Sequence, residues 1–339
     1  MSLRYSYCLA ASALALAAFG CDSADSPIEP TSTSPEVISA PEAPQFAVAS
    51  NTWTSRSDMP LERHGPATAT VPNASGQSIL YVIGGSSAAG GSLSRVQAYN
   101  VATNTWSYKA PLPGPLKRLN GAAVIGGKIY VPGGQVTSDQ ESSKLYVYDP
   151  AGNTWATKQM PEAGFGGITG VIQNKLYVVL YCPDFDHCSF PQRWLLRYDP
   201  ATDQWTYLAT PPEGNNGIGG AIGNKLYLAN QANVLKVYDP ATDTWSQKTT
   251  NLAVRFSAAS VVLGAKLYMI GGRVCNSAGS CTDVRTTNVY DPGTNQWTSR
   301  ASTPTARRGA SAARVFLNGQ ARIELVGGTL PGNNLQYTP

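Results

Sequence analysis

The segment Tyr238-Asp239-Pro240-Ala241-Thr242-Asp243-Thr244-Trp245 recurs with small changes along most of the chain. The other complete copies are Tyr99–Trp106, Tyr148–Trp155, Tyr198–Trp205 and Tyr290–Trp297. One more copy is divided between the two ends, because the chain stops at Tyr337-Thr338-Pro339 and the missing half, Ala49–Trp53, stands near the start. The sequence therefore predicts six repeats, the last of which is completed by the N-terminal segment.

Each copy reads as a strand, a tight turn and a second strand. The aspartate side chain can accept hydrogen bonds from the backbone N–H groups of the turn, proline sets φ, and Thr, Asn or Asp completes the bend. The tryptophans that close the six copies are 53, 49, 50, 40 and 52 residues apart. A period near 50 residues indicates an array of small sheets.

The composition agrees with an all-β chain. It has 339 residues, of which 42% are hydrophobic, 33 are glycine and only 14% are charged. Helical spacing of apolar residues is missing outside the N-terminus, whereas short strand-like runs bounded by Gly, Pro, Asn and Asp recur throughout. Length alone suggests two domains, but a closed ring of sheets is one domain.

Most repeats also contain a hydrophobic strand that ends in a glycine pair. These pairs are Gly84-Gly85, Gly133-Gly134, Gly271-Gly272 and Gly327-Gly328. The third and fourth repeats have Leu180-Tyr181 and Ala229-Asn230 instead, where we expect local distortion. Glycine pair, tyrosine and tryptophan together resemble the kelch motif, over about residues 45–339.

The kelch resemblance implies a six-bladed β-propeller, in which each blade is a four-stranded antiparallel sheet whose first strand lines a central channel. The divided copy then has a mechanical meaning. Residues of about 50 to 55 should form the outermost strand of the last blade, beside Leu335–Tyr337. Closing the ring with strands from both ends removes exposed sheet edges.

The N-terminus predicts export. Arg4 precedes the apolar run Cys8–Phe19, so residues 1–20 are typical of a signal peptide. Gly20-Cys21 resembles a bacterial lipoprotein cleavage site, which implies a lipidated Cys21; a plain cleaved signal is the alternative. Residues 21–44 are rich in Ser, Pro, Thr and Glu and predict a disordered tether. We expect a membrane-anchored lipoprotein in the periplasm or at the cell surface, otherwise a secreted protein, that meets the membrane only through its lipid.

Removing the leader and tether changes the charge. Residues 1–44 hold one arginine and five acids, so the formal net charge of +4 for the whole chain becomes +8 for residues 45–339. A solvated basic surface explains this excess, and nucleic-acid binding is the sharper alternative. Because export separates the protein from nucleic acid, no nucleic-acid partner is expected.

The long connections are predicted to share one face of the ring. They comprise residues 86–95, 135–143, 182–193 and 273–287, which read as irregular loops, whereas the opposite face receives tight turns. Binding is expected on the long-loop face, because long loops on a rigid scaffold commonly carry function.

Two of these loops contain cysteine pairs with identical spacing, Cys182 with Cys188 and Cys275 with Cys281. In an exported protein they predict two loop-closing disulfides. The alternative for the first pair is a metal site, because Asp184, Asp186 and His187 lie between the cysteines, but the second pair repeats the spacing without such ligands. No metal or cofactor is therefore predicted.

Arginines recur where first strands should begin, at Arg63, Arg118, Arg255 and Arg307. One interpretation is a ring of guanidinium groups at the channel mouth that binds a carboxylate, extended by His64, Arg273, Arg285, Arg308 and the aromatic ring of Trp194. The other is that each arginine ties down neighbouring loop carbonyls and that Trp194 packs in the core.

Catalytic motifs are scarce, and Glu62 and His64 are the only weak candidates for proton transfer. We therefore expect a non-enzymatic propeller that binds a protein or an acidic carbohydrate through the long-loop face. The alternative is a carbohydrate-active enzyme acting on an acidic sugar, since exported six-bladed kelch proteins include sialic-acid mutarotases. A purely structural envelope protein is a third possibility.

Overall fold

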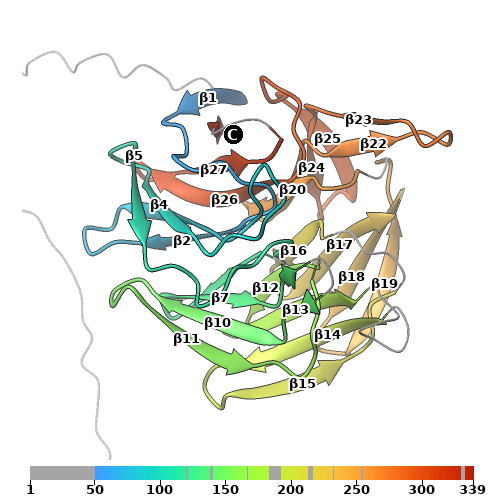
Figure 1. The fold of residues 1–339 in the computed structure, drawn as a ribbon. Helices are drawn as coiled ribbons and strands as arrows, with labels where there is room; N and C mark the ends of the chain where they lie inside the picture. The colour runs from blue at the N-terminus through green and yellow to red at the C-terminus, as the bar shows by residue number, and fades with distance from the viewer. Residues whose placement is uncertain are drawn as a thin grey trace, which may run out of the picture. The chain divides into compact units, whose positions relative to one another are not determined.

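The computed structural model describes residues 50–339 except 120, 138–139, 166, 183–191, 213–216, 232, 253–254 and 330–332. In this part of the chain, six four-stranded antiparallel sheets form a ring (Figure 1). The predicted six-bladed all-β propeller is confirmed. No helix within the described residues has the length and apolar character needed to cross a membrane.

Each blade is a meander that runs from the inside of the ring to its outside. Blade 1 contains β2 (Ala67–Pro72), β3 (Ser78–Ile83), β4 (Val96–Asn100) and β5 (Thr105–Lys109). Blade 2 contains β6 (Ala123–Ile125), β7 (Lys128–Pro132), β10 (Lys144–Asp149) and β11 (Thr154–Gln159). Blade 3 contains β12 (Thr169–Ile172), β13 (Lys175–Cys182), β14 (Gln192–Asp199) and β15 (Gln204–Leu208).

The second half of the ring follows the same order until it closes. Blade 4 contains β16 (Gly219–Ile222), β17 (Lys225–Gln231), β18 (Val234–Asp239) and β19 (Thr244–Thr249). Blade 5 contains β20 (Ala259–Leu263), β21 (Lys266–Ile270), β24 (Thr287–Asp291) and β25 (Gln296–Arg300). Blade 6 contains β26 (Ala310–Leu317), β27 (Gln320–Gly327), β28 (Asn334–Thr338) and β1 (Thr52–Arg56).

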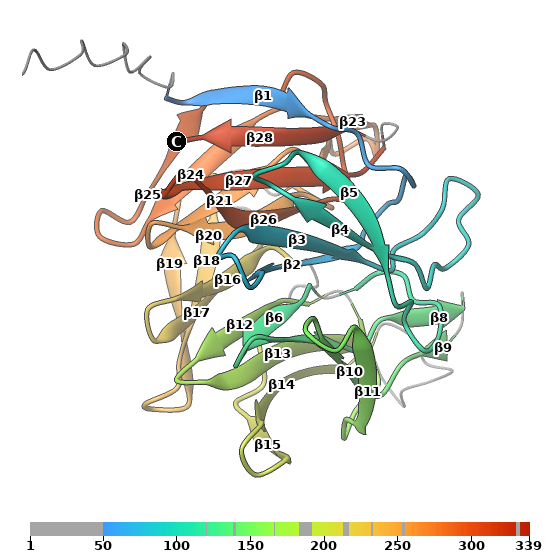
Figure 2. The same cartoon turned by 90° about the vertical axis from the view of Figure 1, so that its left-hand side faces the viewer.

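Blade 6 is completed by both ends of the described chain. Strand β1 pairs antiparallel with β28 (Figure 2), and Trp53 is the register partner of Tyr337. The two rings lie 5.0 Å apart between centroids, and Trp53 Nε1 donates a hydrogen bond of 2.8 Å to the carbonyl of Ala301 in blade 5. The predicted closure by the N-terminal strand is therefore confirmed.

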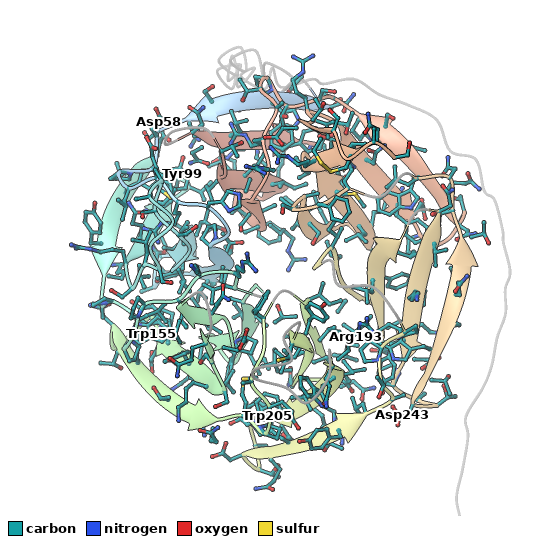
Figure 3. The ribbon with its side chains drawn as sticks, turned by 45° about the vertical axis from the view of Figure 1, so that its right-hand side comes forward. Asp58, Tyr99, Trp155, Arg193, Trp205 and Asp243 are labelled. Carbon is teal, nitrogen blue, oxygen red and sulfur yellow. A yellow bond between two sulfur atoms is a disulfide. The ribbon has the colours of Figure 1, made fainter. Side chains whose placement is uncertain are left out.

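The repeated octapeptide joins its own blade to the preceding one. In the copy at blade 4, Asp243 adopts a φ of 51° and its Oδ1 accepts hydrogen bonds from the Tyr238 hydroxyl (2.6 Å) and the Ala209 N–H (2.9 Å). Trp245 Nε1 donates to the Ala209 carbonyl at 2.8 Å. Because Ala209 follows the last strand of blade 3, the turn holds the two blades together. Figure 3 shows Asp243 at the periphery of the ring, together with Trp155 and Trp205, which are the counterparts of Trp245 in other copies.

Two expectations about the long-loop face need correction. The connections of blades 2 and 5 are not irregular, because they contain the small hairpins β8 (Gln135–Thr137) with β9 (Gln140–Glu141) and β22 (Arg273–Cys275) with β23 (Cys281–Asp283). The expected distortion occurs in blade 4, where the register shifts between Leu228 and Gln231. In blade 3 the pairing of β13 with β14 is continuous, so the missing glycine pair lengthens the sheet instead.

Candidate functional site at the channel mouth

The candidate site lies where the first strand of each blade begins. There, a residue shortly before the first strand forms a backbone bridge to a residue near the end of the second strand: His64 with Ser86, Lys117 with Gln135, Phe165 with Tyr181, and Phe256 with Arg273. In blade 6 the corresponding pair is Arg308 with Thr329, whose N–H donates to the Arg308 carbonyl at 3.1 Å. We call these ten residues the rim. The corresponding residues before the first strand of blade 4, 213–216, lie outside the described part of the chain.

Under the first interpretation of the arginines Arg63 would face a ligand, but its guanidinium is enclosed within blade 1. The residue is only 2% exposed. Its Nη1 donates to the carbonyls of Gly84 (3.0 Å) and Arg95 (2.8 Å), and its Nη2 donates to the side-chain oxygen of Gln97. This is the second interpretation of the arginines, in which each one ties down backbone carbonyls.

Arg255 repeats the same contacts in blade 5. Its Nη1 donates to the carbonyls of Gly271 (3.1 Å) and Thr286 (2.8 Å), and its Nη2 donates to Asn288 Oδ1 (2.8 Å). Burial lowers the pKa of both the Arg63 and the Arg255 guanidinium to about 10. Arg307 is 1% exposed and donates to the carbonyl of residue 333 at 3.4 Å. Guanidinium groups enclosed in this way are inaccessible to a ligand. Arg63, Arg255 and Arg307 therefore do not form a ligand-binding ring with Arg118.

Arg118 is not equivalent to these three arginines. Its φ is positive, at 49°. The residues two positions after each buried arginine also have a positive φ: Gly65 (61°), Ser257 (51°) and Gly309 (64°). In blade 2 that buried position is held by Leu116, whose carbonyl accepts the Gly85 N–H at 2.8 Å. Arg118 is consequently exposed, with its guanidinium carbon 5.2 Å from the centroid of the Phe165 ring.

His64 lies on the rim at the junction of blades 6 and 1. Its imidazole packs directly over Gly309, where a Cβ would be only 2.0 Å from His64 Nε2. Burial lowers the pKa of His64, the positive charges of Arg308 and Arg118 lower it further, and the Asp283 carboxylate opposes them. The imidazole is therefore neutral at pH 7, in a surrounding that is on balance cationic. Glu62, the other weak catalytic candidate, is exposed just before it.

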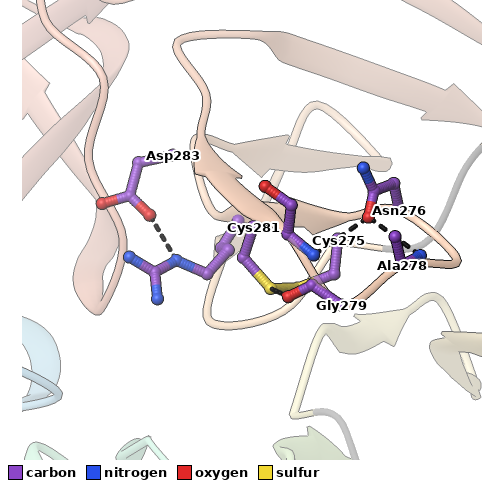
Figure 4. Close-up of a disulfide and its surroundings, with 8 residues drawn as sticks. Cys275, Asn276, Ala278, Gly279, Cys281 and Asp283 are labelled. Atoms are coloured by element: carbon purple, nitrogen blue, oxygen red, sulfur yellow. Dashed lines mark hydrogen bonds and ion pairs between the residues drawn. A yellow bond between two sulfur atoms is a disulfide. The ribbon is translucent and has the colours of Figure 1, made fainter.

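Three further arginines lie near the junction of blades 5 and 6. Arg273 Nε is 2.6 Å from Asp283 Oδ1, the ion pair drawn beside the disulfide in Figure 4. Arg308 Nε is 3.7 Å from Asp283 Oδ2. Asp283 therefore compensates Arg273 more closely than Arg308, whose side chain is 36% exposed. Arg285 is exposed and donates to the Pro304 carbonyl at 3.3 Å. Beside Arg273 on the rim, Phe256 is 43% exposed.

Aromatic residues occupy the rim of blade 3. The rings of Phe165 and Tyr181 meet edge to face with centroids 6.4 Å apart. Arg118 lies over Phe165, and the guanidinium carbon of Arg193 is 5.9 Å from the Tyr181 centroid. Figure 3 shows Arg193 nearer the centre of the ring than the repeat tryptophans. Of the two roles considered for Trp194, an aromatic platform or core packing, the structure shows the second: it packs against the apolar cluster between blades 2 and 3.

A disulfide stabilises the hairpin that projects beside Arg273. Cys275 and Cys281 face each other across β22 and β23 and are bonded, which confirms this predicted disulfide (Figure 4). Asn276 Oδ1 accepts the N–H groups of Ala278 (3.1 Å) and Ser280 (2.9 Å) at the hairpin tip. Cys188 and the residues between it and Cys182 lie outside the described residues, so the second disulfide stays a prediction. Within the described residues, no group of three His, Cys, Asp or Glu side chains could hold a metal ion.

The rim combines cations with aromatic rings. Its described members include the cations Lys117, Arg273 and Arg308 and the aromatics Phe165, Tyr181 and Phe256, and no carboxylate is among them. Such a surface can bind an anion and stack a ring or apolar face beside it. Lys117, Tyr181 and Phe256 were missed from the sequence. Lys117 directly follows the buried Leu116, and Phe256 directly follows the buried Arg255. This spacing could have identified both residues from the sequence.

Comparisons with known proteins agree with this architecture. A model of the KLHDC2/KLHL20/DRC7 Kelch-repeats domain matches residues 42–228, and a model of the Kelch motif matches residues 254–304. Among solved structures, one described as "Structure of YjhT" has a TM-score of 0.64 at 16% sequence identity, covering 82% of this chain and 94% of that chain. No curated protein matches the chain. Since the first match spans more than half of its length, the chain belongs to the Kelch-repeat family of β-propellers.

Proposed function

We propose that this protein is a non-enzymatic binding propeller whose rim takes a ligand that carries a carboxylate. The observation that carries the proposal is the charge of the rim, where Lys117, Arg273 and Arg308 occur without a described rim carboxylate. The nearest acid, Asp283, is 2.6 Å from Arg273 but 3.7 Å from Arg308. Arg308 therefore retains more capacity for an anionic ligand than Arg273.

The aromatic rim residues narrow the ligand class. Phe256 is 43% exposed and forms a backbone bridge with Arg273 in blade 5. The Arg118 guanidinium lies over the face of the Phe165 ring. A ligand with a carboxylate and a ring or apolar face uses both features. Sugar acids and acidic peptides share this chemistry, and the experiment has to distinguish them.

Titration calorimetry with two matched pairs of probes tests the proposal. We expect binding of D-glucuronate but not D-glucose if the ligand is a sugar acid, and binding of hexaglutamate but not hexaglutamine if it is an acidic peptide. Arg308→Ala and Arg118→Ala should weaken binding at least about tenfold, because each removes a charge-assisted contact. Arg314→Ala is the control, since it removes an exposed arginine from the far part of β26.

Two results would contradict the proposal. One is the absence of binding by every probe at low ionic strength, where charge interactions are strongest. The other is equal affinity of Arg308→Ala, Arg118→Ala and Arg314→Ala for whichever probe binds.

His64 supports one alternative, a carbohydrate-active enzyme that interconverts the anomers of an acidic sugar. A neutral imidazole beside cations can accept the proton of an anomeric hydroxyl while the bond between the anomeric carbon and the ring oxygen breaks. The ring oxygen takes up a proton from solvent water, and the sugar passes through its open-chain carbonyl form. Closure on the other face then gives the second anomer. Exchange between the anomers of the bound probe, followed by NMR, should be lost in His64→Ala or Glu62→Gln. Binding without any acceleration of exchange favours the non-enzymatic function.

We also propose that the protein acts outside the cytoplasm, tethered through Cys21 and residues 22–44. The Cys275–Cys281 disulfide supports this location, because such bonds persist in oxidising compartments. Cell fractionation tests the tether: Cys21→Ala should move the protein from the membrane fraction to the soluble fraction and abolish labelling by palmitate. Unchanged fractionation would exclude lipidation at Cys21.

A further inference from the structure

Blade 6 departs from the other blades at one repeated position. In blades 1 to 5 the second strand carries a tyrosine whose ring packs 5.5 to 6.3 Å from the repeat tyrosine of the next blade. These tyrosines are Tyr81, Tyr130, Tyr177, Tyr227 and Tyr268. In blade 6 the corresponding residue is Glu324, which follows Ile323, the partner of Tyr337 in the sheet.

Glu324 is fully buried between blades 6 and 1, with an exposed fraction of 0%. Its Oε1 accepts a hydrogen bond of 2.5 Å from Gln336 Nε2. Among the described residues, its Oε2 has no hydrogen-bond partner. The side chain thus holds one satisfied and one unsatisfied oxygen in a surrounding that also contains Tyr99, Val315 and Val326.

The charged and titratable groups around Glu324 are engaged elsewhere. Arg322, on the same strand, donates to Gln336 Oε1 (3.1 Å) and Thr338 Oγ1 (2.9 Å). Arg56, on β1, donates to the Tyr99 hydroxyl (2.9 Å) and the carbonyl of residue 101 (2.8 Å). Neither arginine is within ion-pair distance of the Glu324 carboxylate among the described contacts, so an ionised Glu324 would be a buried charge without a direct partner.

Other polar atoms at this interface lack partners as well. Both side-chain atoms of the Asn334 amide are buried without a hydrogen bond of normal geometry in the described part of the chain, and the amide is close enough to the Tyr99 hydroxyl to oppose the rise that burial causes in the pKa of Tyr99. Asn334 stands on β28 of blade 6, two residues before Gln336, and Tyr99 stands on β4 of blade 1. Buried polar groups of this kind ordinarily bind ordered water.

We propose that the interface between blades 6 and 1 is a buried proton-binding site, in which Glu324 holds a proton and, with Asn334, binds ordered water, and that loss of this proton loosens ring closure. A carboxylic acid can donate its O–H to such a water, whereas a carboxylate in the same place can only accept. Because β28 carries Gln336 and Asn334 and also pairs with β1, the site lies beside the strand pair that closes the ring.

The direction of the pH effect follows from burial. Burial raises the pKa of Glu324 from 4.5 to about 8, while Arg56 and Arg322 oppose the shift. An open blade exposes the carboxyl group and returns it to its ordinary pKa. Closure is therefore tightest below about pH 4.5, weakens as the pH rises toward 8, and changes little above that.

Hydrogen exchange of the full chain, measured residue by residue between pH 5 and 9, tests the site. The exchange rates of the amides in the β1–β28 pair are divided by those in the β24–β25 pair of blade 5. This ratio cancels the intrinsic pH dependence of exchange. We expect the opening constant of β1–β28 relative to β24–β25 to rise by up to about tenfold per pH unit until pH 8. Glu324→Gln should make this ratio independent of pH, and so should Glu324→Tyr, which restores the tyrosine of the other blades.

A ratio that does not change with pH in the wild-type protein overturns the proposal, and this result does not depend on any variant folding. A pH-dependent ratio that persists in Glu324→Gln overturns the assignment to Glu324. Infrared spectroscopy provides the second readout: a protonated carboxyl band at pH 6 that disappears in Glu324→Gln supports the proton site, and its absence from the wild type contradicts it.

Discussion

Arg307 and Arg308 are neighbours in sequence and lie in opposite environments. Arg307 is 1% exposed and its Nη1 donates to the carbonyl of residue 333 in its own blade, whereas the Arg308 side chain is 36% exposed near Asp283. In an extended segment, successive side chains point to opposite sides. One residue of separation therefore divides a structural arginine from one that can contact a ligand.

Replacing a buried arginine should affect stability and leave the rim intact. Arg255→Ala removes the donors to the Gly271 and Thr286 carbonyls and to Asn288, and it takes this donor from the buried Gly271 carbonyl. We expect the free energy of unfolding in urea to fall by about 2–4 kcal/mol. Arg314→Ala, at an exposed arginine, should change it by no more than about 0.5 kcal/mol. Equal stability of the two variants would show that the buried contacts contribute little.

At the scale of single elements, the ends of the second strands decide what reaches the rim. In blade 5, β21 stops at Ile270 and the glycine pair crosses close to blade 6, where the Gly272 N–H donates to the Arg307 carbonyl at 2.8 Å. In blade 3, β13 continues to Cys182 and brings the Tyr181 ring to the rim. The repeat with a glycine pair thus joins blades, and the repeat without it contributes an aromatic side chain to the mouth.

The glycine pair can be tested with two glycines of similar backbone conformation. Gly271 and Gly264 have φ values of +62° and +58°, but a Cβ at Gly271 would lie 2.5 Å from the Arg307 carbonyl oxygen, whereas at Gly264 it would meet nothing within 4 Å. Gly264→Ala should cost about 1–2 kcal/mol, the cost of the left-handed conformation alone. Gly271→Ala should cost at least about 1–3 kcal/mol more, because the blades must separate. Thermal unfolding of both variants measures the difference, and similar melting temperatures would argue against the close approach.

For the whole molecule, stability depends on closing the ring. The six apolar clusters lie between successive blades, so each blade needs two neighbours to bury both of its faces. Strand β1 supplies the outer edge of blade 6, and Asn51 Oδ1 accepts hydrogen bonds from the Ala301 N–H (2.8 Å) and the Tyr337 hydroxyl (2.8 Å). The closing blade is therefore attached to blade 5 by the same turn contacts that join the other blades.

Deleting residues 45–56 should destabilise the whole ring. The deletion removes β1, the Trp53 contact with blade 5 and the Arg56 contacts with blade 1. A loss of about 3–5 kcal/mol corresponds to a fall in melting temperature of roughly 6–20 °C for a domain of this size. Deleting residues 22–44, which precede the closing strand, is the matched control and should leave the melting temperature unchanged. A deletion of 45–56 that melts like the parent would refute closure by β1.

The sequence alone determined the number of blades, the all-β class and the closing strand. These properties are local or periodic: Tyr238 to Trp245 contains its own turn chemistry, and the spacing of such turns counts the blades. The divided copy at Tyr337 and Trp53 leaves only one way to complete the last blade. The Cys275–Cys281 bond was also predictable, because both cysteines lie in one short loop.

Only the tertiary structure decided which side chains reach the rim. Arg118 looked equivalent to Arg63, but it lies two residues beyond the buried position, which Leu116 holds in blade 2. Its positive φ and the contacts between blades reveal this offset. The burial of Arg255 and of Glu324 likewise depends on segments distant in sequence that cover their side chains. Side-chain direction and desolvation are set by partners distant in sequence, whereas turns and repeat lengths are encoded within each copy.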